Sequence, residues 1–182
     1  MFKFSETKIK DVYVIEPQIF KDARGSFMES YNKAAFNEAG LFYDFVQDNQ
    51  NLSIKGVLRG LHFQRNHPQA KLARVLKGEV FDVAVDLRKG SPTYGQWVGE
   101  ILSEDNCKQL MIPRGFAHGV IVLSDYAEFA YKCDELYHPE DDDGIIWNDS
   151  TINVEWPNID VILSEKDKKR KTLKDNPIEF EV

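Results

Sequence analysis

Short apolar segments, separated by turn-forming residues, run through most of this chain and limit the folds open to it. Many of their residues are β-branched or aromatic, and several segments alternate apolar and polar positions, which is typical of β-strands. We expect strands at residues 11–16, 45–53, 56–63, 71–76, 79–87, 96–102, 107–112, 117–123 and 127–137. In residues 79–87, one parity is apolar and is expected to face the core: Phe81, Val83, Val85 and Leu87. This spacing predicts an all-β sandwich or jelly roll rather than alternating strands and helices.

Helices are expected only at the periphery of this β-structure. Residues 32–39 fit a helix, because Asn32 suits the N-cap and Gly40 lies just past the end. The chain becomes polar and charged from Ser164, where we expect a short helix and a tail packed on the barrel. The length of 182 residues fits one domain spanning residues 1–182.

Residues 56–64 bring a cation and a titratable ring onto one apolar segment. Arg59 and His62 differ in parity, so a regular strand would point them to opposite faces. A bulge at Gly60 would turn both to one side. Together they would suit an anionic substrate and proton transfer. The alternative is a half-buried strand with one solvated arginine and one hydrogen-bonded core histidine.

Charge and cysteine content exclude several classes of function. The net charge of −7 argues against a general nucleic-acid or acidic-membrane surface, although it leaves room for a local basic pocket that binds a phosphorylated small molecule. No apolar run is long enough to span a membrane, and the N-terminus has no apolar signal segment, so we expect a cytoplasmic protein.

Cys107 and Cys133 are isolated and expected to be reduced, with a long-range disulfide as the alternative.

Eight segments, in order along the chain, together resemble the dTDP-4-dehydrorhamnose 3,5-epimerases of the cupin superfamily. They are residues 22–25, 45–49, 56–64, 71–75, 81–88, 112–119, 130–132 and 163–167. The resemblance covers about residues 11–168. It implies a double-stranded β-helix, that is a jelly-roll barrel, which is usually dimeric. It also implies epimerisation of a nucleotide-diphosphate sugar, a 4-keto-6-deoxyhexose, without a cofactor.

Inverting a carbon beside a ketone requires a base, a group that stabilises the enolate oxygen, and an acid on the opposite face. His62 suits the base, because an unperturbed imidazole titrates near pH ~6.5. The resemblance assigns that role to His62, the carboxylate that orients it to Asp167, and the acid to Tyr131. Lys71, at the start of a strand, would stabilise the enolate.

The roles assigned to Asp167, Tyr131 and Lys71 each have a purely structural alternative. Ser164 and Asp167 also form an S-x-x-D capping pattern. Tyr131 could be an ordinary core tyrosine whose hydroxyl finds a partner. Lys71 could be a solvated lysine at a strand edge.

Further positions match substrate-binding residues of the resembled family. Arg24 and Arg59 match residues that contact the diphosphate or the nearby sugar, for which planar guanidinium groups are suited. The other matches are Glu29, Gln47, Asn49, His118 and Asp142. Without the resemblance, we would interpret Arg24 as part of a surface turn, Glu29 as a solvated residue and His118 as a core histidine. The family often has Glu where Asp142 stands, and the register among residues 141–143 stays open.

Many cupins bind a metal through a His-x-His motif followed shortly by Glu. Here His62 is followed at the second position by Gln64, which is a poor ligand for transition metals. The next histidine, His67, lies in a polar turn, and His138 precedes a proline. We therefore expect a metal-free site.

The resemblance implies an isomerase that converts dTDP-4-dehydro-6-deoxy-D-glucose to dTDP-4-dehydro-L-rhamnose. A related epimerase acting at one carbon only, or on another nucleotide-linked 4-keto sugar such as a GDP-sugar, is the main alternative. A non-catalytic sugar-binding cupin or a metal-dependent cupin oxygenase is a more distant one.

Overall fold

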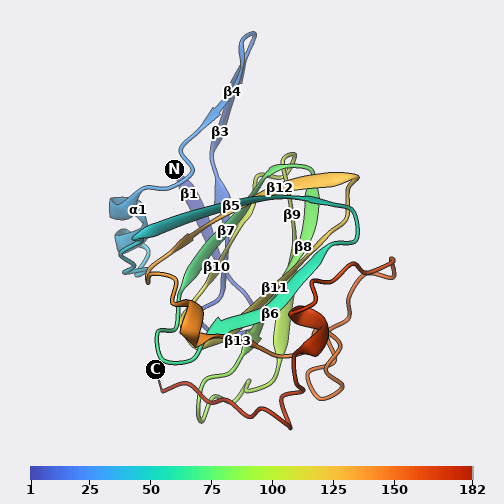
Figure 1. Ribbon diagram of the computed structural model, residues 1–182. Helices are drawn as coiled ribbons and strands as arrows, with labels where there is room; N and C mark the ends of the chain where they lie inside the picture. Colours follow the sequence, from blue (N-terminus) through green and yellow to red (C-terminus); the bar gives the residue numbers. More distant parts are fainter. Residues whose placement is uncertain (182) are drawn as a thin grey trace.

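Two antiparallel sheets face each other and form a barrel, from which one β-hairpin projects (Figure 1). The computed structural model describes residues 1–181. The strands are β1 (Phe2–Glu6), β2 (Tyr13–Pro17), β3 (Ile19–Asp22), β4 (Gly25–Met28), β5 (Gln47–Ile54), β6 (Leu58–Gln64), β7 (Lys71–Lys77), β8 (Glu79–Asp86), β9 (Trp97–Ser103), β10 (Gln109–Ile112), β11 (Phe116–Val122), β12 (Tyr126–Cys133) and β13 (Asp142–Gly144). The helices are α1 (Lys33–Glu38) and the 3-10 turns η1 (Pro139–Asp141) and η2 (Asp167–Lys169).

The strand order is that of a jelly roll. One sheet has six strands in the order β1-β2-β10-β7-β12-β5, and the other has five in the order β13-β6-β11-β8-β9. Strands that are neighbours in these sheets pair antiparallel. The expected all-β barrel with a few short peripheral helices is confirmed. No helix in residues 1–181 has the length and apolar character needed to cross a membrane.

The expected helix has the predicted N-cap. Asn32 Oδ1 accepts hydrogen bonds from the backbone amides of Ala34 at 3.0 Å and Ala35 at 3.2 Å. Gly40 follows the helix with a φ of +83°. From Ser164 the chain forms η2 and then a tail, and the bridge between Arg88 and Phe180 fastens this tail to the barrel.

Two apolar core clusters flank the five-stranded sheet, one on each face. Val80 and Ala84 of β8 belong to the cluster between the two sheets. The opposite parity packs into a core cluster, as expected, and this cluster lies on the outer face of the sheet: Phe81, Val83, Val85 and Leu87. Residues 145–180 cover this outer face with Ile145, Ile152, Leu173 and Phe180. Because both faces of β8 are covered, alternation alone could not identify the face that lines the barrel.

The hairpin β3–β4 was missed by the strand prediction. It projects away from the barrel (Figure 1), and Phe20 and Phe27 on it are 53% and 70% exposed. Charged and small residues break its alternation, so it lacks the signal of a strand with one buried face. The edge strands β1 and β13 were also missed.

The predicted bulge at Gly60 is confirmed. His62 pairs with His118 and Arg59 pairs with Val120, so β6 has one residue more than β11 between these pairs. Gly60 has a φ of +141°, and a Cβ there would lie 2.5 Å from the Cα of Gly119. The bulge lets Arg59 and His62 line the same cavity.

We predict that Gly60→Ala destabilises the fold by about 3 kcal/mol, because it adds backbone overlap to an unfavourable φ. Gly90→Ala is the matched control, since Gly90 has a φ of +70° but open space around its Cα. The control should lose only about 1 kcal/mol. Urea unfolding measures both variants, and equal losses would show that the contact with β11 is unimportant.

Candidate active site

A cavity of about 280 Å³ opens inside the barrel and is lined by both sheets. Its lining residues are Asn49, Gln50 and Asn51 of β5, Arg59 and His62 of β6, Lys71 of β7, His118 and Val120 of β11, and Phe129 and Tyr131 of β12. His62 belongs to the five-stranded sheet and Tyr131 to the six-stranded sheet. An imidazole and a phenol on opposite walls can exchange protons with opposite faces of a ring held between them.

His62 is held by a carboxylate from the C-terminal segment. Its Nε2 lies 2.5 Å from Oδ1 of Asp167, which is buried, while the imidazole itself is about one-third exposed. Ser164 Oγ donates to Asp167 Oδ2 at 2.9 Å and accepts from the Asp167 amide at 3.1 Å. The S-x-x-D contact and the histidine contact therefore coexist, each using a different carboxylate oxygen.

The electrostatics around Asp167 favour its ionised form. Burial acts to raise the pKa of this carboxyl, but the contacts with His62 and Ser164 and the charge of Arg170 outweigh it and lower the pKa below its usual value. Asp167 is therefore a fixed negative charge beside the imidazole at neutral pH.

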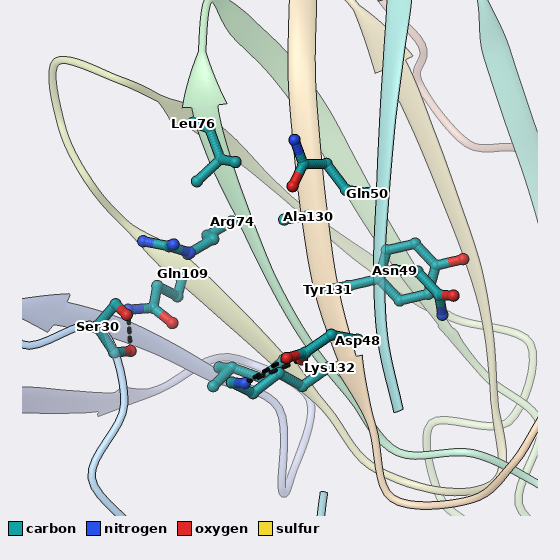
Figure 2. A pocket seen from close by; sticks show the side chains of 11 residues that line it. Ser30, Asp48, Asn49, Gln50, Arg74, Leu76, Gln109, Ala130, Tyr131 and Lys132 are labelled. Carbon is teal, nitrogen blue, oxygen red and sulfur yellow. Dashed lines mark hydrogen bonds and ion pairs between the residues drawn. The ribbon is translucent and has the colours of Figure 1, made fainter. Parts of the chain in front are cut away.

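Lys71 and Tyr131 lie together on the opposite wall. Lys71 Nζ is 5.8 Å from the centroid of the Tyr131 ring. Burial lowers the pKa of the Lys71 ammonium, and burial raises the pKa of the Tyr131 phenol to about 12. Lys71 thus faces an enclosed cavity and is not a solvated strand-edge lysine. Figure 2 shows the Tyr131 ring beside Asn49, pointing away from Arg74 and Gln109 on the outer side of the sheet.

His118 forms a second contact between an imidazole and a carboxylate. Its Nε2 lies 2.7 Å from Oδ1 of Asp82, and both residues are buried. Since His118 also lines the cavity, it is at once a hydrogen-bonded core histidine and a cavity residue. Asp82 was missed from the sequence, because it occupies a polar position in an alternating strand.

A cleft of about 360 Å³ adjoins the cavity and shares Arg59 and His62 with it. Its charged or titratable lining residues are Arg59, His62, Asp142, Lys166, Asp167 and Arg170. Lys166 forms an ion pair with Asp142, and Arg170 Nη2 lies 3.0 Å from the same carboxylate. Lys166 and Arg170 were not predicted, because their segment is rich in charge and resembles a solvated tail.

The three adjacent aspartates have different surroundings. Buried Asp141 accepts hydrogen bonds from the backbone amides of Asn66 and His67, both at 2.8 Å. Asp143 Oδ2 lies 2.6 Å from Arg65 Nε. Asp142 alone of the three lines the cleft.

Three predicted binding residues lie outside the lining of both the cavity and the cleft. Arg24 is on the projecting hairpin, where its Nη2 lies 2.6 Å from Asp22 Oδ2 and its side chain is 90% exposed. Glu29 is exposed and accepts a hydrogen bond from Asn32 at 2.9 Å. Gln47 donates to the side chain of Asn49 at 3.1 Å, so it can orient a cavity residue without lining the cavity.

Gln64 and the two remaining histidines organise loops near the barrel. Gln64 Nε2 donates to the carbonyls of His67 at 2.8 Å and Leu136 at 3.1 Å. The rings of His67 and His138 stack with centroids 3.9 Å apart. Within residues 1–181, no group of three or more His, Cys, Asp or Glu residues has the geometry of a metal site.

We predict that Asp167→Asn lowers the free energy of unfolding at pH 7 by about 1–3 kcal/mol, because a buried partner of His62 loses its charge. The pKa of Asp167 is lowered in the fold, so the wild-type advantage is present above about pH 4 and is lost as the pH falls through the folded-state pKa. Urea unfolding at pH 7 and pH ~3 checks this.

Asp105→Asn is the control for that experiment, since Asp105 is exposed. It should unfold like wild type at both pH values. An Asp167→Asn deficit that is equally large in acid would contradict the ionised state inferred for Asp167.

A family model described as dTDP-4-dehydrorhamnose 3,5-epimerase matches residues 6–175. The dTDP-4-dehydrorhamnose 3,5-epimerase of Methanothermobacter thermautotrophicus is 54% identical over 180 residues, which cover 97% of each chain. That of Escherichia coli K12 is 55% identical over 170 residues, which cover 92% of each chain.

Solved structures agree with this match. The dTDP-6-deoxy-D-glucose-3,5-epimerase of Legionella pneumophila, in complex with dTDP-4-keto-L-rhamnose, superposes with a TM-score of 0.95 and 47% identity over 100% of both chains. A 3'-monoepimerase from Streptomyces bikiniensis, in complex with dTDP-quinovose, has a TM-score of 0.87 and 30% identity over 92% of this chain and 86% of its own. The chain therefore belongs to the dTDP-4-dehydrorhamnose 3,5-epimerase family.

Proposed function

We propose that this protein epimerises C3 and C5 of dTDP-4-dehydro-6-deoxy-D-glucose and yields dTDP-4-dehydro-L-rhamnose. The observation that carries the proposal is the placement of His62 and Tyr131 on opposite sheets around one cavity, with Lys71 beside the phenol. The 3,5-epimerases that are 54–55% identical to this chain support the same reaction.

His62 is the base that removes the proton beside the ketone. Asp167 orients the imidazole and stabilises the imidazolium that forms, as a carboxylate does for histidine in other general bases. The negative charge that develops on the 4-oxygen is stabilised by Lys71, whose location in an enclosed cavity strengthens the interaction.

Tyr131 returns a proton to the opposite face of the ring. Because burial raises the pKa of its phenol to about 12, Tyr131 stays protonated at neutral pH and is available as an acid. The base, the acid and the enolate stabiliser are all side chains of this chain, so the proposed reaction needs no cofactor and no metal.

The charged cleft beside the cavity would hold the diphosphate. Arg59 lies at its junction with the cavity, and its Nη2 donates to Ser53 Oγ at 3.1 Å, which leaves other guanidinium donors for phosphate oxygens. Lys166 adds a second cation at the same cleft. Asn49, His118 and Asp142 line the cavity or the cleft and are proposed to contact the substrate directly, and Gln47 to act through Asn49.

We predict that His62→Ala lowers deuterium incorporation from D2O at C3 and C5 by about 10²–10⁴-fold, because proton removal loses its base. Proton NMR of dTDP-4-dehydro-6-deoxy-D-glucose incubated with each variant measures this. Exchange at the wild-type rate would remove His62 from the base role, and exchange at one carbon only in wild type would favour a monoepimerase.

Tyr131→Phe is the matched variant on the other wall. Deprotonation does not need the acid on the opposite face, so this variant should retain exchange but lose most inversion. A normal yield of inverted product from Tyr131→Phe would contradict the proposed role of the phenol.

We also propose that the protein is a homodimer, with a second copy covering the outer face of the six-stranded sheet. Residues 145–180 cover the outer face of the five-stranded sheet, whereas Leu52, Ile54 and Tyr126 on the other sheet are 68%, 62% and 50% exposed. The same outer face has a hollow of about 270 Å³ beside Arg74 and Gln109 (Figure 2). An exposed apolar patch on a sheet is typical of an interface.

The dimer would also account for the two predicted binding residues that lie far from the cavity. Arg24 and Glu29 are on and just after a hairpin that projects from its own barrel (Figure 1). We propose that they contact the substrate in the partner's cavity. The exposed Phe20 and Phe27 of the hairpin would then be covered by the partner.

We predict that Leu52→Glu combined with Ile54→Glu yields a monomer at micromolar concentration, because each change would bury an unpaired charge at the interface. Sedimentation equilibrium measures the mass. Leu136→Glu, at an exposed position on the loop after β12, should leave the dimer intact. A wild-type protein that sediments as a monomer would contradict the proposed assembly.

We further propose that the protein works in a reducing compartment, the cytoplasm. Cys107 and Cys133 are both free thiols, which is typical of proteins kept in such a compartment.

A further inference from the structure

Arg170 is buried behind the contact between His62 and Asp167. Its side chain is 9% exposed, and its Nη2 and Nη1 lie 3.0 Å from Asp142 and 3.2 Å from Asp143. Its Nε, which has no hydrogen-bond partner within residues 1–181, lies 4.0 Å from Oδ1 of Asp167. The same Asp167 oxygen contacts the imidazole at 2.5 Å. Arg170 and His62 thus share one carboxylate oxygen.

The ion pairs behind this oxygen form a cluster of three cations and three carboxylates, which is neutral when the imidazole is neutral. The three cations are Arg65, Lys166 and Arg170, and the three carboxylates are Asp142, Asp143 and Asp167. Arg59 of β6 faces the same cleft from the side where the diphosphate is proposed to bind, and Lys71, His118 and Tyr131 line the cavity together with His62. These residues stand outside the ion-paired cluster and are unchanged in the variants below. Glu165 and Lys168 form an exposed ion pair with each other. A proton added to His62 leaves the cluster with one unbalanced positive charge.

A base beside a carboxylate faces an electrostatic conflict. A carboxylate at 2.5 Å favours the imidazolium form, yet His62 must be unprotonated to accept a proton from the sugar. A cation near the same carboxylate oxygen opposes that preference, while the contact that orients the ring remains. Arg170 occupies that place.

We propose that Arg170 is a positioning residue that keeps His62 unprotonated at neutral pH by acting through Asp167. This inference rests on the proposed role of His62 as the base. Loss of Arg170 would leave the cluster one charge negative, and protonation of His62 would then restore its balance.

The test uses the variant Arg170→Met and measures the protonation of His62 and kcat/KM as functions of pH. NMR titration of the His62 ring in the substrate-free protein should show a midpoint about one pH unit higher than in wild type. The acidic limb of kcat/KM should move with it, so that kcat/KM below that limb falls about tenfold, while at higher pH it approaches the wild-type value.

Two variants serve as controls for the charge. Arg170→Lys retains the cation and should restore most of the wild-type profile. Lys168→Met removes an exposed positive charge from η2, just before Arg170, and should leave the profile unchanged. A titration midpoint that moves equally in Lys168→Met would show a general charge effect and overturn the role of Arg170.

Asp143→Asn provides a test of opposite sign that does not depend on whether Arg170→Met folds. It removes a carboxylate that contacts Arg170, so the His62 midpoint and the acidic limb should move to lower pH. If Arg170→Met lowered kcat/KM equally at every pH and left the His62 midpoint unchanged, Arg170 would have only a structural role.

The two readouts separate this inference from the proposed function. A shifted His62 midpoint in a protein without epimerase activity would support the role of Arg170 and contradict the epimerase. An active epimerase whose His62 midpoint is the same in wild type and Arg170→Met would support the proposed function and contradict the role of Arg170.

Discussion

The contact between His62 and Asp167 joins parts of the chain that are 105 residues apart. It fastens the C-terminal segment to β6, and the same segment covers the outer face of the five-stranded sheet with its apolar side chains. A polar contact on one side and an apolar cluster on the other thus set the position of β6. His62, the proposed base, is therefore held by tertiary structure and not by its own strand alone.

The proposed reaction also requires access to both faces of a sugar ring, and the barrel provides it. A jelly roll has two facing sheets, and inward side chains of β6 and β12 meet across the space between them. The bulge at Gly60 adds Arg59 to the side that carries His62. One residue of extra strand length thereby joins the cavity between the sheets to the charged cleft beside it.

Much of the fold and of the candidate site could be predicted from the sequence, because short residue patterns indicate local structure. Alternation located most strands, Asn32 located the helix cap, and the parity conflict between Arg59 and His62 required a bulge. The contacts of Arg170 and Asp82 could not be predicted, because each depends on a partner from a distant segment. The roles assigned to Arg24 and Glu29 stay predictions, since they require a second copy of the chain.

The most direct test of the central claim is a crystal structure of the protein with dTDP-4-dehydro-L-rhamnose bound. The account predicts that the sugar ring lies between His62 and Tyr131, with its 4-oxygen toward Lys71 and the diphosphate at Arg59. A sugar bound outside the barrel, or one whose two faces both point away from these side chains, would contradict it.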